Sequence, residues 1–337
     1  MKMMKVLLVE LEYNYGVIEK GPNQIFKLGF LSAFKKIVSD VHLFYYDKYL
    51  NDLKTLQNQL LQESDKVQPD LIFFCIFGDH FEVSTLINLK NKFTTMNWFG
   101  DDQWRFNSFT KNYAKYFTYC VTTDHFSVSK YQEMGIDNVI LSQWAAFDDF
   151  HDFKHEHENE HAYKYDVSFI GAYHPHRKWI IDKLRKIGLD AICYGPGWEN
   201  GACTVEEMKK IFSSSKINLN LANSTSFDLR YLMTSYRNII NTYRSPKSDS
   251  QIKARHFEIS YYGGFQLSYY VPFLETYFEI GNEITCYSNV EEIIKLVEYF
   301  LINQDQRESI RKRGMNRARR EHLYYHRIDS IFSKLKK

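Results

Sequence analysis

The sequence predicts an α/β protein made of two Rossmann-like halves, each built on a parallel sheet. Apolar strands alternate with helical segments along both halves of the chain, which is the order of parallel strands joined by crossover helices. Most of these strands are continuous apolar runs, as in strands that are buried on both faces. At 337 residues, the chain is also too long for one ordinary core.

The first half begins with Lys5–Val9, a short apolar run of the buried-strand type. Apolar residues at helical spacing follow in 24–38. The predicted strands are 5–9, 41–46, 70–77, 95–99, 119–122 and 138–141, and the predicted helices are 24–38, 50–66, 83–92 and 127–134.

The second half repeats the alternation and carries helix-start signals. Pro175 suits a first helical turn, where its missing N–H costs nothing. Thr204 and Glu207 have the spacing of a capping box, and Asn289 is placed to cap a later helix. The predicted strands are 166–170, 191–194, 217–221, 265–270 and 283–287, and the predicted helices are 175–187, 204–212, 254–262, 290–301, 306–321 and 327–335. The Ser- and Asn-rich segment 225–250 is predicted to be an insertion.

A polar segment marks the boundary between the two halves. We predict four parts: an N-terminal Rossmann-like domain over 1–150, a linker over 151–163, a C-terminal Rossmann-like domain over 164–303 and a helical tail over 304–337. The segment contains several histidines, so a metal site is an alternative to a linker; they are His151, His155, His157 and His161. Little in the segment would hold such ligands in place, which favours a solvated linker.

Charge and cysteine usage narrow the class of protein. The formal net charge is +2, so no global field favours nucleic acid or an acidic partner. None of the five cysteines forms a CxxC pair, which is typical of free thiols in a reducing compartment. The apolar run near the N-terminus is too short for a signal peptide, and no run is long enough to span a bilayer. We therefore expect a cytoplasmic protein; peripheral contact with a membrane stays open.

The first candidate site follows the strand 166–170. This strand ends at Gly171, and Pro175 opens the next helix, whose free amides favour an anion. Arg177 adds a full charge and a planar fork that matches phosphate. The alternative is a strand-to-helix loop with an incidental arginine, and a G-x-G-x-x-G fingerprint is absent from the sequence.

Two asparagines mark the strand 217–221 as a second candidate site. Asn218 and Asn220 alternate with apolar residues and fall on one face. A central parallel strand is usually apolar on both faces. Buried amides there need hydrogen-bond partners, either from protein groups or from a ligand. An edge strand with one wet face is the alternative.

The third candidate site is a short helix within 253–264. Arg255 and Glu258 fall on one face of this helix, beside the carboxyl edge of the predicted sheet, where α/β proteins bind nucleotides. Glu258 could accept two ribose hydroxyls. Arg255, with Lys253 or Arg177, could neutralise a diphosphate. The alternative is an ordinary surface ion pair.

A glycine pair ends the same helix. Gly263 and Gly264 would let backbone amides approach a ligand closely. The alternative is that Gly263 serves only as a helix C-cap.

These ordered motifs resemble those of one enzyme family. Arg-x-Phe-Glu-(x)4-Gly-Gly-Phe at 255–265, preceded by Asp-Val-Ser-Phe-Ile-Gly at 166–171 and by Arg177, looks like the C-terminal half of GT-B glycosyltransferases. The similarity is to the branch that includes spore-maturation-type proteins, and it continues to Arg327. In the first half, the segment 97–105 also looks like this branch.

The resemblance implies two Rossmann-like domains that face a cleft, with a nucleoside diphosphate sugar, most readily a UDP-sugar, on the C-terminal domain. It implies that Glu258 holds the ribose and that Gly263, Gly264 and Phe265 lie by the diphosphate. It implies no metal and no cofactor besides this donor substrate. The chain departs from the family in one respect: many retaining relatives have a further glutamate where this chain has Ser250.

The first half should supply the acceptor side of the reaction. Asp101 and Asp102 follow a predicted strand at its carboxyl end, where catalytic groups gather. Either could be the general base for an acceptor hydroxyl. Asp79 and His80 end the preceding parallel strand and form a second candidate. The alternative in each case is a polar loop or a helix cap.

Basic residues are concentrated in the predicted tail. A solvated helical face is the default interpretation, and a dock for anionic lipid or nucleic acid is the alternative. The run consists of Arg307, Arg311, Lys312, Arg313, Arg317, Arg319 and Arg320.

Together, the residues and the resemblance predict a glycosyltransferase that moves a sugar from a nucleoside diphosphate to an acceptor hydroxyl, with retention and without a metal. Arg255 and Arg177 would stabilise the leaving diphosphate, and Asp102 or a donor phosphate oxygen would take the acceptor proton. The alternatives are a nucleotide-sugar epimerase and a non-catalytic nucleotide-sugar-binding module. The sequence leaves open the oligomeric state and the acceptor, which could be a glycan, a lipid-linked sugar, a protein or a nucleic acid.

Overall fold

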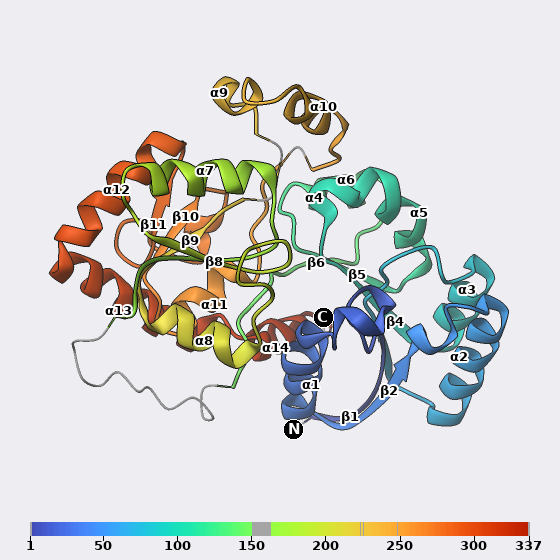
Figure 1. Ribbon diagram of the computed structural model, residues 1–337. Coiled ribbons are helices and arrows are strands. Elements are labelled where there is room, and N and C mark those ends of the chain that lie inside the picture. Colours follow the sequence, from blue (N-terminus) through green and yellow to red (C-terminus); the bar gives the residue numbers. More distant parts are fainter. Residues whose placement is uncertain (1, 150–162, 223, 225, 248, 336–337) are drawn as a thin grey trace. The chain divides into compact units, whose positions relative to one another are not determined.

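The computed structural model describes residues 2–149, 163–222, 224, 226–247 and 249–335 (Figure 1). The chain divides into two compact units: unit 1 is Met1–Asp148 with Leu323–Lys337, and unit 2 is Asp149–His322. Each unit is an α/β body on a parallel sheet, as predicted. The predicted linker, with its four histidines, lies outside the described residues except for Tyr163.

Unit 1 has a six-stranded sheet in the order β2-β1-β3-β4-β5-β6, and all neighbouring strands pair in parallel. The strands are β1 (Lys2–Glu10), β2 (Val38–Tyr45), β3 (Leu71–Phe74), β4 (Thr94–Phe99), β5 (Tyr119–Thr122) and β6 (Val139–Leu141). The winding direction reverses between β1 and β3. Open α/β sheets bind ligands at such a switch point, beyond the carboxyl ends of the strands.

Helices cover both faces of this sheet. The six predicted strands and the long predicted helices are confirmed, but the helical turns of 102–116 were not predicted. The helical elements of unit 1 are η1 (Asn14–Gly16), η2 (Ile18–Lys20), η3 (Ile25–Leu31), α1 (Ser32–Ile37), η4 (Tyr46–Tyr49), α2 (Leu53–Val67), α3 (Val83–Lys92), α4 (Asp102–Arg105), η5 (Phe106–Thr110), α5 (Lys111–Tyr113), η6 (Ala114–Tyr116), α6 (Ser127–Glu133) and α14 (Tyr324–Lys334).

The predicted helical tail is divided between the two units. Helix α14 belongs to unit 1, where the ring of Tyr324 packs on Phe30 with centroids 5.0 Å apart and Phe332 packs on Phe34 at 5.9 Å. The helix before it, α13 (Gln304–Glu321), belongs to unit 2. The tail is therefore not one part, because each helix buries its apolar residues against a different sheet domain.

Unit 2 has a five-stranded parallel sheet in the order β11-β10-β9-β7-β8. Its strands are β7 (Tyr165–Ile170), β8 (Ala191–Tyr194), β9 (Ser215–Asn220), β10 (Gln266–Tyr269) and β11 (Thr285–Tyr287). The winding direction reverses between β7 and β9, so the switch point of this unit lies at their carboxyl ends.

Helix α7 lies on one side of this sheet, and α8 and α11 lie on the other (Figure 1). The predicted starts are confirmed: Pro175 is the first residue of α7, Thr204 and Glu207 form a capping box, and the Asn289 side chain accepts from the amide of Glu292 at 3.0 Å. The helical elements are α7 (Pro175–Lys186), α8 (Val205–Ser213), α9 (Leu229–Leu232), α10 (Tyr236–Arg244), α11 (Arg255–Tyr261), η8 (Leu274–Thr276), α12 (Val290–Ile302) and α13.

Two further sequence expectations concern the chain as a whole. All five cysteines are free thiols. In the part of the chain that the structure describes, no helix combines the length and the apolar character needed to cross a membrane.

Candidate functional site

Arg177 joins the carboxyl ends of two strands at the switch point of unit 2. Its Nε donates to the carbonyl oxygens of Leu221 at 3.1 Å and Ala222 at 3.0 Å. Its Nη1 donates to the carbonyl of Ala172 at 2.9 Å, and Nη2 bonds Leu221 again at 2.7 Å. Phe169 packs against the guanidinium, and burial lowers the pKa of Arg177 to about 10. The guanidinium therefore donates its hydrogen bonds to main-chain carbonyls and holds the loops after β7 and β9 in place.

Glycines let these loops pack closely. A side chain at Gly171 would place its Cβ 2.9 Å from the ring of Phe169 and 3.4 Å from Nη1 of Arg177. At Gly195, where φ is +132°, a Cβ would lie 2.2 Å from the carbonyl oxygen of Gly171. Gly171 and Arg177 thus lie close together at the carboxyl edge of the sheet.

The two asparagines of β9 are satisfied by protein groups. The Asn218 oxygen accepts from the Ser168 hydroxyl at 2.9 Å, and its nitrogen donates to the Phe212 carbonyl at 3.1 Å. The Asn220 amide donates to the Ser268 hydroxyl at 3.0 Å. Both side chains are buried on a central strand, so the edge-strand alternative is wrong. Each of the two side-chain amides therefore has a protein partner without a ligand.

The ion pair of α11 is not on the surface. Helix α11 runs opposite to the strands, so its first turn lies toward the carboxyl edge of the sheet. Nε of Arg255 lies 3.5 Å from Oε2 of Glu258, and Glu258 is buried. Burial raises the pKa of Glu258, Arg255 lowers it, and Asp149 raises it further. A buried carboxylate with one cation beside it lowers the stability of the fold, and such groups are typical of functional sites.

A buried polar network adjoins this pair. Nζ of Lys209 lies 2.8 Å from Asp149 and 2.6 Å from Glu206, and the Tyr262 hydroxyl donates to Asp149 at 2.7 Å. The Lys209 side chain is almost fully buried. The network holds α8 against the end of α11. The sequence analysis missed it because Asp149 lies in a polar segment far from the other members.

The glycine pair forms a helix cap. The Gly263 amide donates to the Ser260 carbonyl at 3.0 Å, and the Gly264 amide donates to the Ile259 carbonyl at 2.8 Å, which is the pattern of a Schellman cap. A Cβ on Gly264 would lie 2.6 Å from Nδ2 of Asn218. Both amides are therefore already bonded, and the pair lies before β10, at the amino edge of the sheet. The C-cap interpretation describes these glycines.

Three more predicted positions have structural partners. Phe265 is fully buried, with its ring 4.7 Å from that of Phe300. The amide of Lys253 donates to Nδ1 of His256 at 3.0 Å, which orders the turn before α11. The hydroxyl of Ser250, where the resembling family has a glutamate, lies 2.8 Å from that of Ser224.

The arginines of α13 bond to carbonyl groups of unit 2. Nη1 of Arg307 donates to Phe300 at 2.6 Å, and Nη1 of Arg311 donates to Gly263 at 3.2 Å. The same holds for Arg313, Arg317 and Arg319, which donate to the carbonyls of Asn282, Tyr277 and Tyr261. These five arginines attach the helix to its neighbours and are neither a simple solvated face nor an open anion dock.

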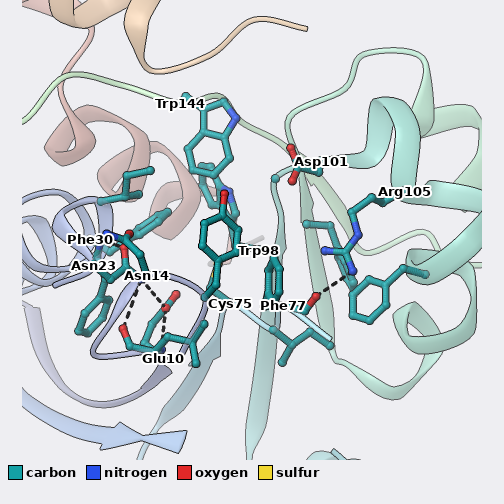
Figure 2. Close-up of a pocket in the computed structure, with 18 of the residues that line it drawn as sticks. Glu10, Asn14, Asn23, Phe30, Cys75, Phe77, Trp98, Asp101, Arg105 and Trp144 are labelled. Atoms are coloured by element: carbon teal, nitrogen blue, oxygen red, sulfur yellow. Dashed lines mark hydrogen bonds between the residues drawn. The ribbon is translucent and has the colours of Figure 1, made fainter. Parts of the chain in front are cut away.

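Unit 1 contains a cavity of about 220 Å³ at the carboxyl ends of β1, β3 and β4 (Figure 2). It therefore lies at the switch point of this sheet. Its aromatic wall includes Tyr15, Phe77, Trp98 and Trp144. Its polar lining consists of Glu10, Asn14, Asn23, Cys75, Asp101, Arg105 and Thr110.

Glu10 is the most strongly perturbed carboxyl group of this cavity. Its side chain accepts from the Leu11 amide at 3.1 Å and from the Asn23 amide at 3.5 Å. Burial raises the pKa of Glu10 to about 8, against a smaller opposing effect of Cys75. The sequence analysis missed this residue, although a carboxylate that directly ends an apolar strand, after Val9, was a usable signal.

The two predicted aspartates have different surroundings. Asp101 lines the cavity, whereas Asp102 is not among its lining residues. Asp102 accepts hydrogen bonds from Thr110 and Thr122 at 2.6 Å and from Tyr131 at 2.9 Å. Burial raises the pKa of Asp102 to about 6 in spite of these bonds. Asp102 thus ties α4 to β5, η5 and α6, and of the two predicted candidates only Asp101 lines the cavity.

The second predicted pair lies away from the cavity lining. The carbonyl of His80 accepts from Gln57 at 2.9 Å, and burial lowers the pKa of the His80 ring. Neither Asp79 nor His80 is among the described residues that line the cavity. Within the described residues there is also no group of three or more His, Cys, Asp or Glu side chains arranged to hold a metal ion.

Two residues at the cavity are held in special positions. Nη2 of Arg105 donates to the Phe77 carbonyl at 2.8 Å, and its guanidinium lies 4.2 Å from the ring centre of Phe109. Tyr15 has φ +58°, in the left-handed region, and its ring meets that of Phe77 edge-on at 5.1 Å. Strained non-glycine residues of this kind cluster at ligand sites.

Comparison with known proteins bears on unit 2 first. Residues 177–333 match a protein family described as "Glycosyl transferase-like". This segment contains Arg177, Arg255 and Glu258. No curated protein matches the sequence.

Solved structures match the whole chain. HepE from Anabaena, in complex with UDP and glucose, superposes with a TM-score of 0.64 and 11% identity over 99% of both chains. Sucrose-phosphate synthase from Thermosynechococcus elongatus gives 0.61 and 9% over 98% of this chain and 99% of its own. A putative UDP-N-acetylglucosamine 2-epimerase from Listeria monocytogenes gives 0.51 and 9% over 100% and 97%.

The chain has the GT-B fold. At these identities the likeness to the solved structures shows the fold, with two Rossmann-like domains as predicted. The glycosyl transferase-like match covers most of unit 2 together with α14. Membership of the spore-maturation-type branch stays a prediction.

Proposed function

We propose that the protein is a glycosyltransferase that moves a sugar from a nucleoside diphosphate to an acceptor hydroxyl. The observation that carries this proposal is the glycosyl transferase-like match of 177–333, since that segment contains both Arg177 and the Arg255–Glu258 pair. HepE, solved with UDP and glucose, shares the fold, and a UDP-sugar is therefore the first donor to test. The free thiols favour a cytoplasmic location for this enzyme.

In this proposal the donor binds to unit 2 at the carboxyl ends of β7 and β9. Glu258 accepts the ribose hydroxyls, as acidic residues do at other Rossmann-like sites. The first amides of α7, after Gly171, suit the diphosphate. Arg255 is the better partner for the leaving diphosphate, because the donors of Arg177 are largely bonded to carbonyl oxygens.

The proposed transfer forms one bond and breaks one. The acceptor oxygen bonds to the anomeric carbon of the donor sugar, and the bond from that carbon to the diphosphate oxygen breaks. The diphosphate leaves with the electron pair, and Arg255 offsets its charge. The acceptor proton passes to a donor phosphate oxygen or to Asp101. Following the resemblance, we propose retention at the anomeric carbon and no requirement for a metal.

Two alternatives have specific support. Ser250 stands where resembling retaining enzymes have a glutamate, and its hydroxyl is bonded to Ser224, which favours a non-catalytic nucleotide-sugar-binding module. The fold likeness to a putative UDP-N-acetylglucosamine 2-epimerase favours an epimerase.

Product analysis separates the three. The protein is incubated with UDP-sugars, with and without a panel of hydroxyl acceptors, and the products are identified by mass spectrometry and proton NMR. A transferase yields UDP and a glycosylated product only with acceptor, and the coupling constant of the new linkage reports retention. Epimerised sugar from donor alone, or donor binding without turnover across the panel, would contradict the transferase. The same assay in EDTA tests metal independence.

A further inference from the structure

The cavity of unit 1 has no role in donor binding as proposed above. It is lined by residues of unit 1 alone and lies at the switch point between β1 and β3. We propose that this cavity binds one neutral sugar ring of the acceptor, with the Glu10 carboxyl group bonded to a ring hydroxyl and the indoles of Trp98 and Trp144 against the ring. The assignment of this sugar as the acceptor rests on the proposed glycosyl transfer. The binding of a sugar to the cavity is tested separately.

The size of the cavity favours a single ring. Its volume is about 220 Å³, whereas pockets for drug-sized ligands occupy ~300–1,000 Å³. A nucleoside diphosphate sugar is of that larger size class and would not be enclosed. One monosaccharide unit is the largest part of an acceptor that the cavity can enclose.

The composition of the walls favours a sugar over a purely apolar ligand. A pyranose presents C–H groups on its faces and hydroxyls around its edge. The indoles of Trp98 and Trp144 pack on each other at a tilt of 57°, with ring centroids 5.7 Å apart, and both contribute apolar atoms to the cavity wall. In Figure 2, Glu10 and Arg105 lie on opposite sides of these rings, where they can meet hydroxyls at two edges of one ligand.

The hydrogen-bonding capacity at the cavity is only partly used. A protonated carboxyl group has one O–H donor and acceptor positions on its oxygens, and among the described residues the hydrogen bonds at the Glu10 carboxyl group involve Leu11, Asn23 and Cys75. The Arg105 fork has five N–H donors, one of which is bonded to the Phe77 carbonyl. The buried indole N–H of Trp98 has no hydrogen-bond partner in the described part of the chain.

The charge of the lining favours a neutral ligand. With the Glu10 carboxyl group protonated at neutral pH, Asp101 and Arg105 are the remaining acidic and basic side chains among the lining residues. A phosphate or a uronic acid would bring an extra negative charge into a partly desolvated space that offers it one cation beside a carboxyl group, which costs free energy. A neutral ring with hydroxyl groups meets both acceptors and donors.

The rim of the cavity is built with strain. Tyr15 adopts φ +58° and is followed by Gly16 at φ +71°. The amide of Asn14 donates to the Gly21 carbonyl at 2.9 Å, and its side chain donates to the carbonyls of Lys20 and Pro22. These bonds hold the loop 13–22 in one shape, with Tyr15 against Phe77 at the cavity. Maintained strain of this kind is expected where it positions a contact.

The test is a titration of the full-length protein with methyl glycosides of glucose, galactose, mannose and N-acetylglucosamine, followed by tryptophan fluorescence. Trp98 and Trp144 report directly on the cavity. We expect a saturable change with at least one glycoside, which is lost in the double variant Trp98→Phe/Trp144→Phe. Absence of a saturable change with every glycoside would overturn the proposal.

Substitution at Glu10 tests the specific contact. Glu10→Met keeps the length of the side chain and removes its oxygens, and replacing a buried carboxyl with an apolar group should not prevent folding. We expect the dissociation constant to rise at least tenfold, with partial recovery in Glu10→Gln, which keeps one acceptor oxygen. Glu19→Met, at an exposed position of the loop 13–22, is the matched control. Equal affinity of Glu10→Met and the wild type would contradict the assigned contact.

A parallel titration with UDP separates this inference from the proposed function. Sugar binding without binding of any nucleoside diphosphate would leave the cavity as a sugar site and would end the transferase proposal. Binding of UDP without any sugar signal would do the reverse.

Discussion

Nε of Arg255 lies 3.5 Å from a carboxylate oxygen of Glu258, and the two partners differ in access to solvent, with side chains 26% and 7% exposed. The carboxylate is therefore held in place, while part of the guanidinium can still meet a ligand. Burial raises the pKa of Glu258, and a hydrogen-bond donor from a ligand would favour its charged form. This arrangement is the basis of the donor site proposed for unit 2.

We predict that Glu258→Gln lowers kcat/KM for the nucleotide sugar at least a hundredfold, because the amide cannot accept both ribose hydroxyls. The melting temperature should stay near that of the wild type, because the new amide oxygen can still accept from Arg255 and that guanidinium is partly solvated. Steady-state kinetics and a thermal melt measure the two effects. Glu298→Gln, at an exposed position of α12, is the control. Wild-type kinetics in Glu258→Gln would remove this residue from the mechanism.

The two neighbouring aspartates should separate stability from activity. We predict that Asp102→Ala lowers the free energy of unfolding by about 1–3 kcal/mol, because three buried hydroxyls lose their acceptor. Asp101→Ala should lower the free energy of unfolding by less than Asp102→Ala does and should lower turnover instead. Urea unfolding and the transfer assay measure both. The reverse pattern would restore Asp102 as the catalytic candidate.

The cap of α11 should not tolerate a side chain at its second glycine. Gly264→Ala would force a Cβ to 2.6 Å from Asn218 and 3.0 Å from the Ile259 carbonyl, and we predict a loss of about 1–3 kcal/mol. Gly188→Ala is the comparison, because φ is +84° there but nothing lies within 4 Å of the new Cβ. It should cost about 1 kcal/mol. Denaturant midpoints that rank these variants in the opposite order would contradict the close packing.

The stability of unit 1 should depend on pH through Glu10. Burial raises the pKa of Glu10 from 4.5 to about 8 in the folded state, so the folded protein holds this proton more tightly than the unfolded chain. Below about pH 4.5 the burial of Glu10 does not lower the free energy of unfolding through its ionisation. As the pH rises toward 8, the loss of unfolding free energy that it causes increases. Asp47 adds to this cost, whereas the hydrogen bonds with Cys75 and with the Leu11 amide offset part of it.

Glu10→Gln removes the titration. We predict that the difference in free energy of unfolding, variant minus wild type, increases by about 2–4 kcal/mol between pH 5 and pH 8. Urea titrations at several pH values measure the difference, and Glu19→Gln should show a flat one. A gap that narrows with rising pH would show that Glu10 is ionised in the folded state.

Most of the fold could be predicted because its signals are local. Apolar runs such as Lys5–Val9 fixed the strands, and Pro175 and Asn289 marked helix starts that the structure confirms. The helical turns of 102–116 were missed because aromatic and polar residues are mixed there without a helical period. The division of the tail was also hidden, because a sequence does not show which sheet a helix will pack against.

The candidate sites were harder to predict because their environments are not local. Helical spacing paired Arg255 with Glu258, but it did not show that Gly263, which follows α11, lies at the amino edge of the sheet. The partners of Asp102 come from η5, β5 and α6, and no spacing rule brings them together. The burial of Glu10 likewise depends on residues far along the chain.

Equilibrium binding of UDP to the full-length protein tests the central claim most directly. Isothermal titration calorimetry should show one saturable site, with affinity reduced at least tenfold in Glu258→Gln and unchanged in Glu298→Gln. If neither UDP nor any other nucleoside diphosphate binds, or if Glu258→Gln binds as tightly as the wild type, then unit 2 does not hold the donor in the way proposed.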